Sequence, residues 1–282
     1  MSQIKVSELF YSIQGEGRYQ GVPSIFLRTF GCNLTCDCFG MPKGQKSNER
    51  LSIEAKNYKD YKSLPLVTTG CDSYASWDPR FKHLSPVFDT STIATNIVSL
   101  LPQSKWNDIH LVITGGEPLL GWQKAFMELL DQPEMAELDH LTFETNGTKP
   151  LTEDFEIYLR DWVWDRDDTG ESLTFSVSPK LSCSGEEHDK AINPKVLCQY
   201  QEVGFTYLKF AVATEEDVNE ALVVVEEYRD QGFFGPVYLM PIGGVESVYR
   251  LNNRRIAELA MKHGLRYSDR LQVPLFKNAW GT

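Results

Sequence analysis

The sequence predicts an α/β fold with parallel strands, either a partial or full β/α barrel or a doubly wound sheet. Short runs of β-branched and aromatic residues recur along the chain, and helical patterns lie between several of them. Most of these runs are nearly continuously apolar, which is typical of strands buried on both faces. Strand and helix in alternation favour parallel βα units with right-handed crossovers. Six such strands suit a partial (β/α)6 barrel.

The predicted strands cover residues 24–30, 109–115, 140–146, 173–178, 206–213 and 236–241. The predicted helices cover residues 91–101, 121–131, 152–161, 215–230 and 247–263. The clearest helix is 215–230, in which apolar residues from Val218 to Val225 recur at steps of three and four. Thr214, with Asp217 three residues later, has the pattern of a capping box at its start.

Residues 39–70 interrupt this alternation. They are polar, rich in Lys, Ser and Asn, and show no clear period. We therefore predict an insertion after the first strand that lies over the surface. A chain of 282 residues can form one large α/β domain, and we predict a single domain over 1–282 that contains this insertion.

The overall charge and the N-terminus narrow the class of protein. A formal net charge of −11 disfavours general binding to nucleic acid, because phosphate backbones attract basic surfaces. The N-terminus has no apolar signal segment, and no apolar run is long enough to span a bilayer. These features predict a cytoplasmic protein with no membrane partner.

Four of the six cysteines are grouped in two segments. Cys32, Cys36 and Cys38 lie within residues 31–40, and Cys71 follows in "GCDSYASWD". In a reducing compartment such a group indicates a metal or catalytic site rather than disulfides. Zinc and iron–sulfur clusters both suit thiolate-rich sites, so the number of cysteines does not choose between them. Cys183 and Cys198 stand apart, and we interpret them as ordinary buried residues.

Polar or glycine-rich segments follow five of the predicted strands. They are residues 31–36, 114–118, 144–148, 178–180 and 240–244. In parallel α/β folds the chemistry lies at the carboxyl ends of the strands, where such segments meet. We therefore expect these five segments, including the cysteines, to surround one shared site.

A cysteine loop after the first strand and a GGE segment after the second resemble the radical S-adenosylmethionine (SAM) enzymes. In that superfamily three cysteines hold a 4Fe–4S cluster, and the amino and carboxylate groups of SAM bind the fourth iron. The resemblance implies that Gly115, Gly116 and Glu117 approach the methionyl part of SAM. Glycine suits this place because a Cβ would block a close approach.

A narrower resemblance covers nearly the whole chain. "ELFYSIQGEGRYQGVPSIFLRTFGCNLTC" is similar to the N-terminus of 7-carboxy-7-deazaguanine synthases, and "TGGEPLL", "FETNGT" and "SVSPKLS" follow in that family's order. The resemblance implies a radical SAM barrel and the conversion of 6-carboxy-5,6,7,8-tetrahydropterin to 7-carboxy-7-deazaguanine. A 5′-deoxyadenosyl radical would remove a hydrogen atom from the pterin C6, the ring would contract with release of ammonia, and Mg²⁺ would assist.

The same resemblance assigns roles to single residues. It implies that the pterin is bound by Ile13, Gln14, Gly15, Glu16, Arg28 and Thr114. It implies that SAM is bound by Gly115, Gly116, Glu117, Ser178, Pro179, Lys180, Met240, Pro241, Ile242 and Gly243. The planar guanidinium of Arg28 suits a bidentate grip on the pterin carboxylate.

The motif register favours Cys71 as the third cluster ligand, with Cys38 as the rival. Relatives carry CxxxCxxC followed by Asp-Thr, and here Cys71 with Asp72 and Ser73 matches the segment that begins at the third cysteine. Cys32, Cys36 and Cys71 would then be the ligands, and Ser73 would contact Mg²⁺ in place of the threonine. In the rival arrangement Cys38 completes a short CxxxCxC loop.

Two other classes of function stay open. One is a different radical SAM enzyme, such as an activase that installs a glycyl radical on a partner protein. The other is a non-enzymatic zinc or iron–sulfur binding protein. By resemblance to the synthases, we expect a flavodoxin or ferredoxin-type reductant and a homodimer.

Overall fold

The computed structural model describes residues 2–166 and 170–282. The strands in this part of the chain form one mixed sheet in the order β3-β1-β2-β4-β5-β6-β7-β8-β9. Their bounds are β1 Gln3–Ile13, β2 Pro23–Thr29, β3 Val87–Asp89, β4 His110–Gly115, β5 Leu141–Thr145, β6 Leu173–Val177, β7 Phe205–Val212, β8 Val237–Pro241 and β9 Arg266–Tyr267. All six predicted strands are present, as β2 and β4 to β8.

The α-helices in the described part are α1 Glu49–Ser52, α2 Thr90–Leu100, α3 Gln123–Leu130, α4 Glu153–Trp164, α5 His188–Ala191, α6 Pro194–Val203, α7 Glu215–Asp230, α8 Glu246–Lys262 and α9 Gln272–Phe276. The five predicted helices correspond to α2, α3, α4, α7 and α8. The capping box of α7 is formed as expected, because the Thr214 hydroxyl accepts the Asp217 N–H and the Asp217 carboxylate accepts the Thr214 N–H.

The sheet is parallel from β2 through β4 to β9, and its spatial order there follows the order along the chain. A doubly wound sheet would instead reverse direction at a switch point. The sequence prediction omitted β1, which pairs antiparallel with both β2 and β3. The α/β class with a mostly parallel sheet is therefore confirmed, with an antiparallel edge added.

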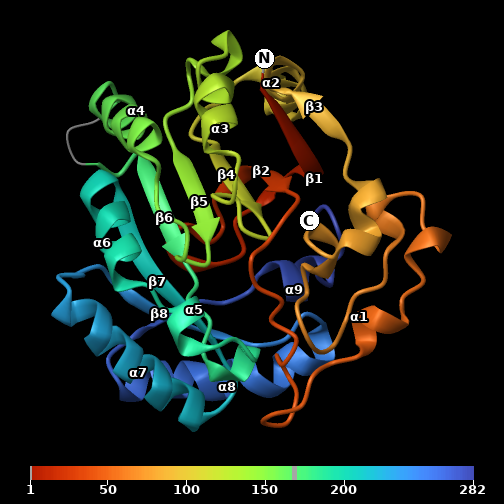
Figure 1. The fold of residues 1–282 in the computed structure, drawn as a ribbon, viewed down its shortest axis with the longest axis vertical. Coiled ribbons are helices and arrows are strands. Elements are labelled where there is room, and N and C mark those ends of the chain that lie inside the picture. Colours follow the sequence, from red (N-terminus) through yellow and green to blue (C-terminus); the bar gives the residue numbers. More distant parts are fainter. Residues whose placement is uncertain (1, 167–169) are drawn as a thin grey trace.

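The main core lies between this sheet and the helices that cover its outer face (Figure 1). Helix α2 packs on β1, α6 on β6 and β7, α7 on β7, and α8 on β8 and β9. Strands β6 and β8 are buried along their whole length, which explains their continuous apolar sequences. Within the described residues, no helix has the length and apolar character that a bilayer crossing requires.

Residues 39–70 have an apolar core of their own, which the sequence pattern did not predict. Tyr61, Leu64 and Val67 are buried together with Tyr74 and other residues that follow the insertion. Trp280 from the C-terminal segment closes this cluster, since its ring lies 4.9 Å from Tyr61 and its indole N–H donates to the Leu64 carbonyl at 2.9 Å. The contact between Trp280 and Leu64 joins residues more than 200 positions apart, so no periodic pattern within residues 39–70 could reveal it.

A pair of histidines lies at the amino ends of β4 and β5. The His110 and His140 rings stack with centroids 4.4 Å apart, and Tyr19 meets His110 edge-on at 4.6 Å. Burial, together with the neighbouring His140, lowers the pKa of His110 to about 4. His110 therefore stays neutral in the folded protein at pH values where an exposed histidine binds a proton.

We expect His110 to make the protein less stable as the pH falls. Because the folded pKa is depressed, its contribution is fully present above about pH 6.5 and is lost progressively toward pH 4. The loss should be on the order of 3 kcal/mol. Urea unfolding across this range should show a shallower pH dependence for His110→Phe than for the wild type, whereas His83→Phe, which changes an exposed histidine, should match the wild type. Equal slopes for wild type and His110→Phe would contradict the assignment.

Candidate active site

A cavity of about 270 Å³ is lined by the loops at the carboxyl ends of the parallel strands. The insertion and the C-terminal segment also contribute to its wall. The predicted site residues that line it are Ile13, Gln14, Gly15, Glu16, Arg28, Cys32, Cys36, Cys71, Ser73, Thr114, Gly115, Gly116, Ser178, Lys180, Met240, Pro241, Ile242 and Gly243. The expectation that segments after several strands meet at one site is therefore confirmed.

The structure brings Cys71, rather than Cys38, to the side of Cys32 and Cys36. All three thiols line the cavity, and Cys71 accepts a hydrogen bond from the Trp77 indole N–H at 3.3 Å. Cys38 is buried elsewhere and does not line the cavity; its thiol lies against Gly185. The long excursion through residues 39–70 thus returns the chain to the first two cysteines.

Burial controls the protonation of these thiols. It raises the pKa of Cys32 to about 11 and that of Cys71 to about 12, and it places the pKa of Cys36 well above its ordinary value. All three are therefore neutral at pH 7 without a cofactor. Since thiolates are the form that binds metal, loading a cluster has to release their protons.

The adjacent glycines Gly115 and Gly116 let the loop after β4 lie directly against the cysteine loop. A Cβ on Gly115, whose φ is 152°, would stand 2.4 Å from the Thr29 carbonyl oxygen. A Cβ on Gly116 would stand 2.4 Å from the Gly31 carbonyl oxygen. Close packing against the protein's own backbone therefore requires both glycines, in addition to any approach to a ligand.

Glu117 does not reach the cavity, contrary to the direct contact that the motif implied. Its side chain is fully buried, and its carboxylate accepts hydrogen bonds from the Thr145 hydroxyl at 2.8 Å, the Asn146 N–H at 2.7 Å and the Leu119 N–H at 3.1 Å. Burial raises the pKa of Glu117 in spite of these donors. Glu117 thus ties the loop after β4 to the loop after β5. Pro179 is also absent from the cavity lining, although Ser178 and Lys180 on either side belong to it.

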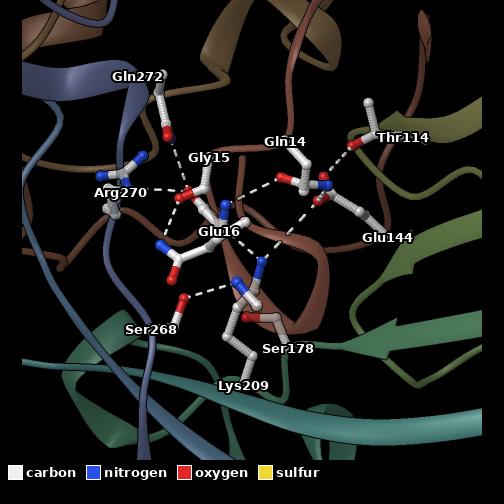
Figure 2. Close-up of polar contacts among 12 residues, drawn as sticks. Gln14, Gly15, Glu16, Thr114, Glu144, Ser178, Lys209, Ser268, Arg270 and Gln272 are labelled. Atoms are coloured by element: carbon white, nitrogen blue, oxygen red, sulfur yellow. Dashed lines mark hydrogen bonds and ion pairs between the residues drawn. The ribbon is translucent and has the colours of Figure 1, made fainter. Parts of the chain in front are cut away.

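Glu16 is the centre of a buried charge network (Figure 2). Its carboxylate meets Lys209 Nζ at 2.5 Å, Arg270 Nε at 3.0 Å and Gln272 Nε2 at 2.8 Å. Burial alone would raise the pKa of Glu16, but the two cations outweigh it and hold that pKa well below its ordinary value. Glu16 is therefore ionised, and three neighbouring side chains fix its position.

Glu144 occupies the next part of the same wall. Its two oxygens accept hydrogen bonds from Gln14 Nε2 at 3.2 Å and from Thr114 Oγ1 at 3.0 Å, and Lys209 Nζ lies 4.0 Å away (Figure 2). The Gln14 amide, the Thr114 hydroxyl and the Glu144 carboxylate thus lie side by side on this wall of the cavity. Such a surface can match the donors and acceptors along the edge of a flat heterocycle.

Arg28 lies between this wall and the cysteine loops. Its Nε donates to Glu8 at 2.9 Å, and its Nη1 lies 3.5 Å from the Ser73 hydroxyl. Burial would lower the pKa of Arg28, but Glu8 reverses the direction and raises it. Arg28 is thus a partly buried cation that Glu8 holds in place, and its remaining N–H donors lie beside Ser73.

Similar proteins share the full length of this chain. A 7-carboxy-7-deazaguanine synthase from Halobacterium salinarum is 32% identical, with 98% of this chain and 91% of the relative aligned. A second from Rhodopirellula baltica is 30% identical over 100% of this chain and 90% of the relative. The chain belongs to the 7-carboxy-7-deazaguanine synthase family. It is therefore a radical SAM enzyme, as the cysteine and GGE motifs predicted.

A solved structure supports the fold of this family member. The crystal structure of QueE from Escherichia coli aligns with a TM-score of 0.54 at 21% identity, over 94% of this chain and 93% of that one. No family model matches the chain.

The family implies a 4Fe–4S cluster and SAM, and the cysteine side of the cavity fits them. Among the described residues no three His, Cys, Asp or Glu side chains are grouped closely enough for a single metal ion. A four-iron cluster is wider than one ion, and each of its thiolates binds a different iron. Three thiols line the cavity, and no fourth cysteine of the described residues lines it. This number matches a cluster that keeps one iron free.

Several residues that line this cavity were not among those predicted from the sequence. They are Glu8, Asp72, Lys209, Arg270 and Gln272, and Glu144 was predicted only as the first residue of the segment 144–148. Lys209 and Glu144 carry a signal in the sequence, because each places a charge inside an otherwise largely apolar strand, as Arg28 does. Arg270 carries none, because its partner Glu16 is 254 residues away.

Proposed function

We propose that this protein converts 6-carboxy-5,6,7,8-tetrahydropterin to 7-carboxy-7-deazaguanine by ring contraction with release of ammonia. The observation that carries the proposal is that one cavity places three free thiols beside a polar wall and a partly buried arginine. The cluster and SAM would supply the radical that removes a hydrogen atom from the pterin. The polar wall would hold the pterin with C6 toward the cluster.

In this proposal Cys32, Cys36 and Cys71 hold the cluster, while Cys38 is a bystander. The SAM side of the cavity comprises Gly115, Gly116, Ser178, Lys180 and the loop 240–243. Gln14, Glu16 and Glu144 face the pterin ring, with Thr114 beside them. Arg28 directs its free donors to the pterin carboxylate.

The same proposal covers the architecture and the partners. We assign the six parallel strands β2 and β4 to β8 to the partial (β/α)6 barrel of a single radical SAM domain, with residues 39–70 as an insertion within it. A flavodoxin or ferredoxin-type protein would supply the electron. We place the enzyme in the cytoplasm as a homodimer, with a small molecule and no nucleic acid as its substrate.

The direct test is an anaerobic assay of the reconstituted protein with SAM, a reductant and the carboxypterin. Mass spectrometry should detect 7-carboxy-7-deazaguanine together with 5′-deoxyadenosine. Deoxyadenosine without the deazaguanine would leave a radical SAM enzyme with a different substrate. A colourless, zinc-loaded protein that does not cleave SAM would refute the proposal.

We expect Arg28→Ala to weaken pterin binding by about 2–4 kcal/mol, because a charge-assisted contact to the carboxylate is lost. SAM cleavage in the absence of pterin should change little. Binding can be measured by calorimetry on the SAM-loaded protein. Arg18→Ala, which removes an arginine outside the cavity lining, is the matched control.

Arg28→Ala also leaves the buried Glu8 carboxylate without its ion-pair partner. A second variant is therefore needed to separate this effect from the loss of pterin binding. Glu8→Gln combined with Arg28→Ala removes the unpaired charge and should still bind pterin weakly. Wild-type affinity in this double variant would show that Arg28 does not grip the substrate.

We expect turnover to depend on Mg²⁺ held by the Ser73 hydroxyl together with substrate oxygens. Mg²⁺ prefers oxygen ligands and keeps several waters, so one protein contact is enough. Ser73 lines the cavity, and its hydroxyl lies 3.4 Å from Asp72 Oδ1. Removing Mg²⁺ should lower product formation, and adding it back should restore the rate. Unchanged turnover under magnesium-selective chelation would exclude the ion.

A further inference from the structure

The cysteine loop contains a backbone conformation that has to be held in place. Cys36 has a φ of 52°, in the left-handed region that residues other than glycine rarely adopt. Such a residue persists only where its surroundings compensate for the strain. In this loop the strained residue is itself one of the proposed cluster ligands.

Glu186 supplies the compensation from a different part of the chain. One oxygen of its carboxylate, Oε1, accepts the Thr35 N–H at 2.7 Å, the Thr35 hydroxyl at 3.1 Å and the Cys36 N–H at 2.7 Å. In the described part of the chain, the hydrogen bonds that this carboxylate accepts come from Thr35 and Cys36. Its polar contacts are therefore directed to the cysteine loop.

Residues 184 and 185 complete a contact surface for this loop. The Ser184 carbonyl accepts the Cys38 N–H at 3.1 Å, and the Ser184 hydroxyl accepts the Glu186 N–H at 3.2 Å. Gly185 has a φ of 85°, and a Cβ there would stand 2.4 Å from Cys38 Sγ. We call residues 184–186 the clamp segment, because they hold the cysteine loop from Thr35 to Cys38.

The clamp segment belongs to the same connection as two proposed SAM contacts. Ser178 and Lys180 follow β6 and line the cavity, and the clamp segment begins a few residues later, before α5. One connection therefore contacts both the SAM side of the cavity and the back of the cysteine loop.

We propose that Glu186 is a positioning residue for the iron–sulfur cluster. It presets the Thr35–Cys36 turn, so that the Cys36 thiol faces Cys32 and Cys71 before any iron is bound. This inference rests on the proposed function, because it needs the three cysteines to be cluster ligands. Glu186 would touch neither iron, SAM nor pterin, and it would act through two backbone N–H groups and one hydroxyl.

The test compares iron retention in Glu186→Ala and Glu186→Gln after anaerobic reconstitution. Glutamine keeps an oxygen acceptor at the same place, whereas alanine removes it. Loss of a group that orients a metal ligand typically costs about 10- to 100-fold in metal affinity. Glu186→Ala should therefore lose iron to a competing chelator about 10- to 100-fold more readily than the wild type, and Glu186→Gln should stay close to the wild type. The absorbance of the cluster gives an independent reading.

Glu187→Gln is the matched control. The neighbouring Glu187 is exposed and pairs with Lys190 at 2.8 Å, away from the cysteine loop. This variant should retain iron as the wild type does. Thermal unfolding of the cluster-free proteins should separate a loss of the clamp from a general loss of stability.

The possible outcomes lead to separate conclusions. Iron retention in Glu186→Ala equal to that of Glu187→Gln would overturn the inference, and so would equal losses in the alanine and glutamine variants. If Glu186→Ala does not fold, wild-type iron retention by Glu186→Gln supports the acceptor role and its loss overturns it. A wild-type protein that binds no cluster would refute the proposed function itself. A wild type that binds the cluster but does not convert the pterin would contradict the proposed substrate, and the positioning role of Glu186 would still be judged by iron retention in its variants.

Discussion

Cys71→Ala should fail to assemble a 4Fe–4S cluster and should form no 5′-deoxyadenosine. The Cys71 thiol lines the cavity with Cys32 and Cys36, and removing it leaves a second iron without a protein ligand, in addition to the iron that is open to SAM. Iron and sulfide analysis after anaerobic reconstitution, followed by SAM cleavage, measures both effects. The expected result is loss of most of the iron and of all detectable cleavage.

Cys38→Ala is the matched control for this experiment. The Cys38 thiol packs against Gly185 outside the cavity, so its removal should leave the iron and sulfide content nearly unchanged. Full iron and sulfide content in Cys71→Ala, together with loss of the cluster in Cys38→Ala, would instead identify the short CxxxCxC loop as the cluster site. Loss in both variants would indicate a fourth protein ligand and would contradict an open iron.

Lys209→Met should destabilise the protein by about 3–5 kcal/mol, because the largely enclosed Glu16 carboxylate loses one of its two cations. Lys209 is almost completely buried and contacts Glu16 at 2.5 Å, with Glu144 4.0 Å away. Arg270 remains beside Glu16, so we expect the lower end of this range. Urea unfolding of the cluster-free protein measures the change without any cofactor.

Two further variants test the cause of this loss. Lys262→Met breaks an exposed ion pair with Glu215 on the surface and should cost less than about 1 kcal/mol. Adding Glu16→Gln to Lys209→Met removes the stranded charge and should recover part of the stability. If Lys209→Met unfolds at the same midpoint urea concentration as the wild type, the charge network around Glu16 contributes little to stability.

The positions of the strands were predictable because the relevant signal is local. Strands such as β6 and β8 are apolar along their whole length, and each is followed at once by a polar or glycine-rich segment. Parallel strands place their carboxyl ends at one edge, so a local pattern was enough to predict a shared site. The strand β1 was missed because the predicted sheet began at residue 24, although β1 pairs antiparallel with the neighbouring β2 as well as with the distant β3.

The partners of the charged groups could not be predicted in the same way. Glu16 was recognised as a site residue from its motif, but its cation Arg270 is 254 residues away and comes from the segment after β9. Glu117 was expected at the cofactor, yet hydrogen bonds from the β5 loop keep its carboxylate inside the protein. Motifs specify which residue types are present, whereas packing determines which way their side chains point.

The sequence by itself determined the fold class, the family, and the set of candidate ligands that includes both Cys38 and Cys71. Only the tertiary structure decided which of these two thiols joins Cys32 and Cys36 at the cavity. The physical reason lies in residues 39–70 and the clamp segment. An apolar cluster closed by Trp280 returns Cys71 to the cavity, and the contact with Ser184 and Gly185 turns Cys38 away from it.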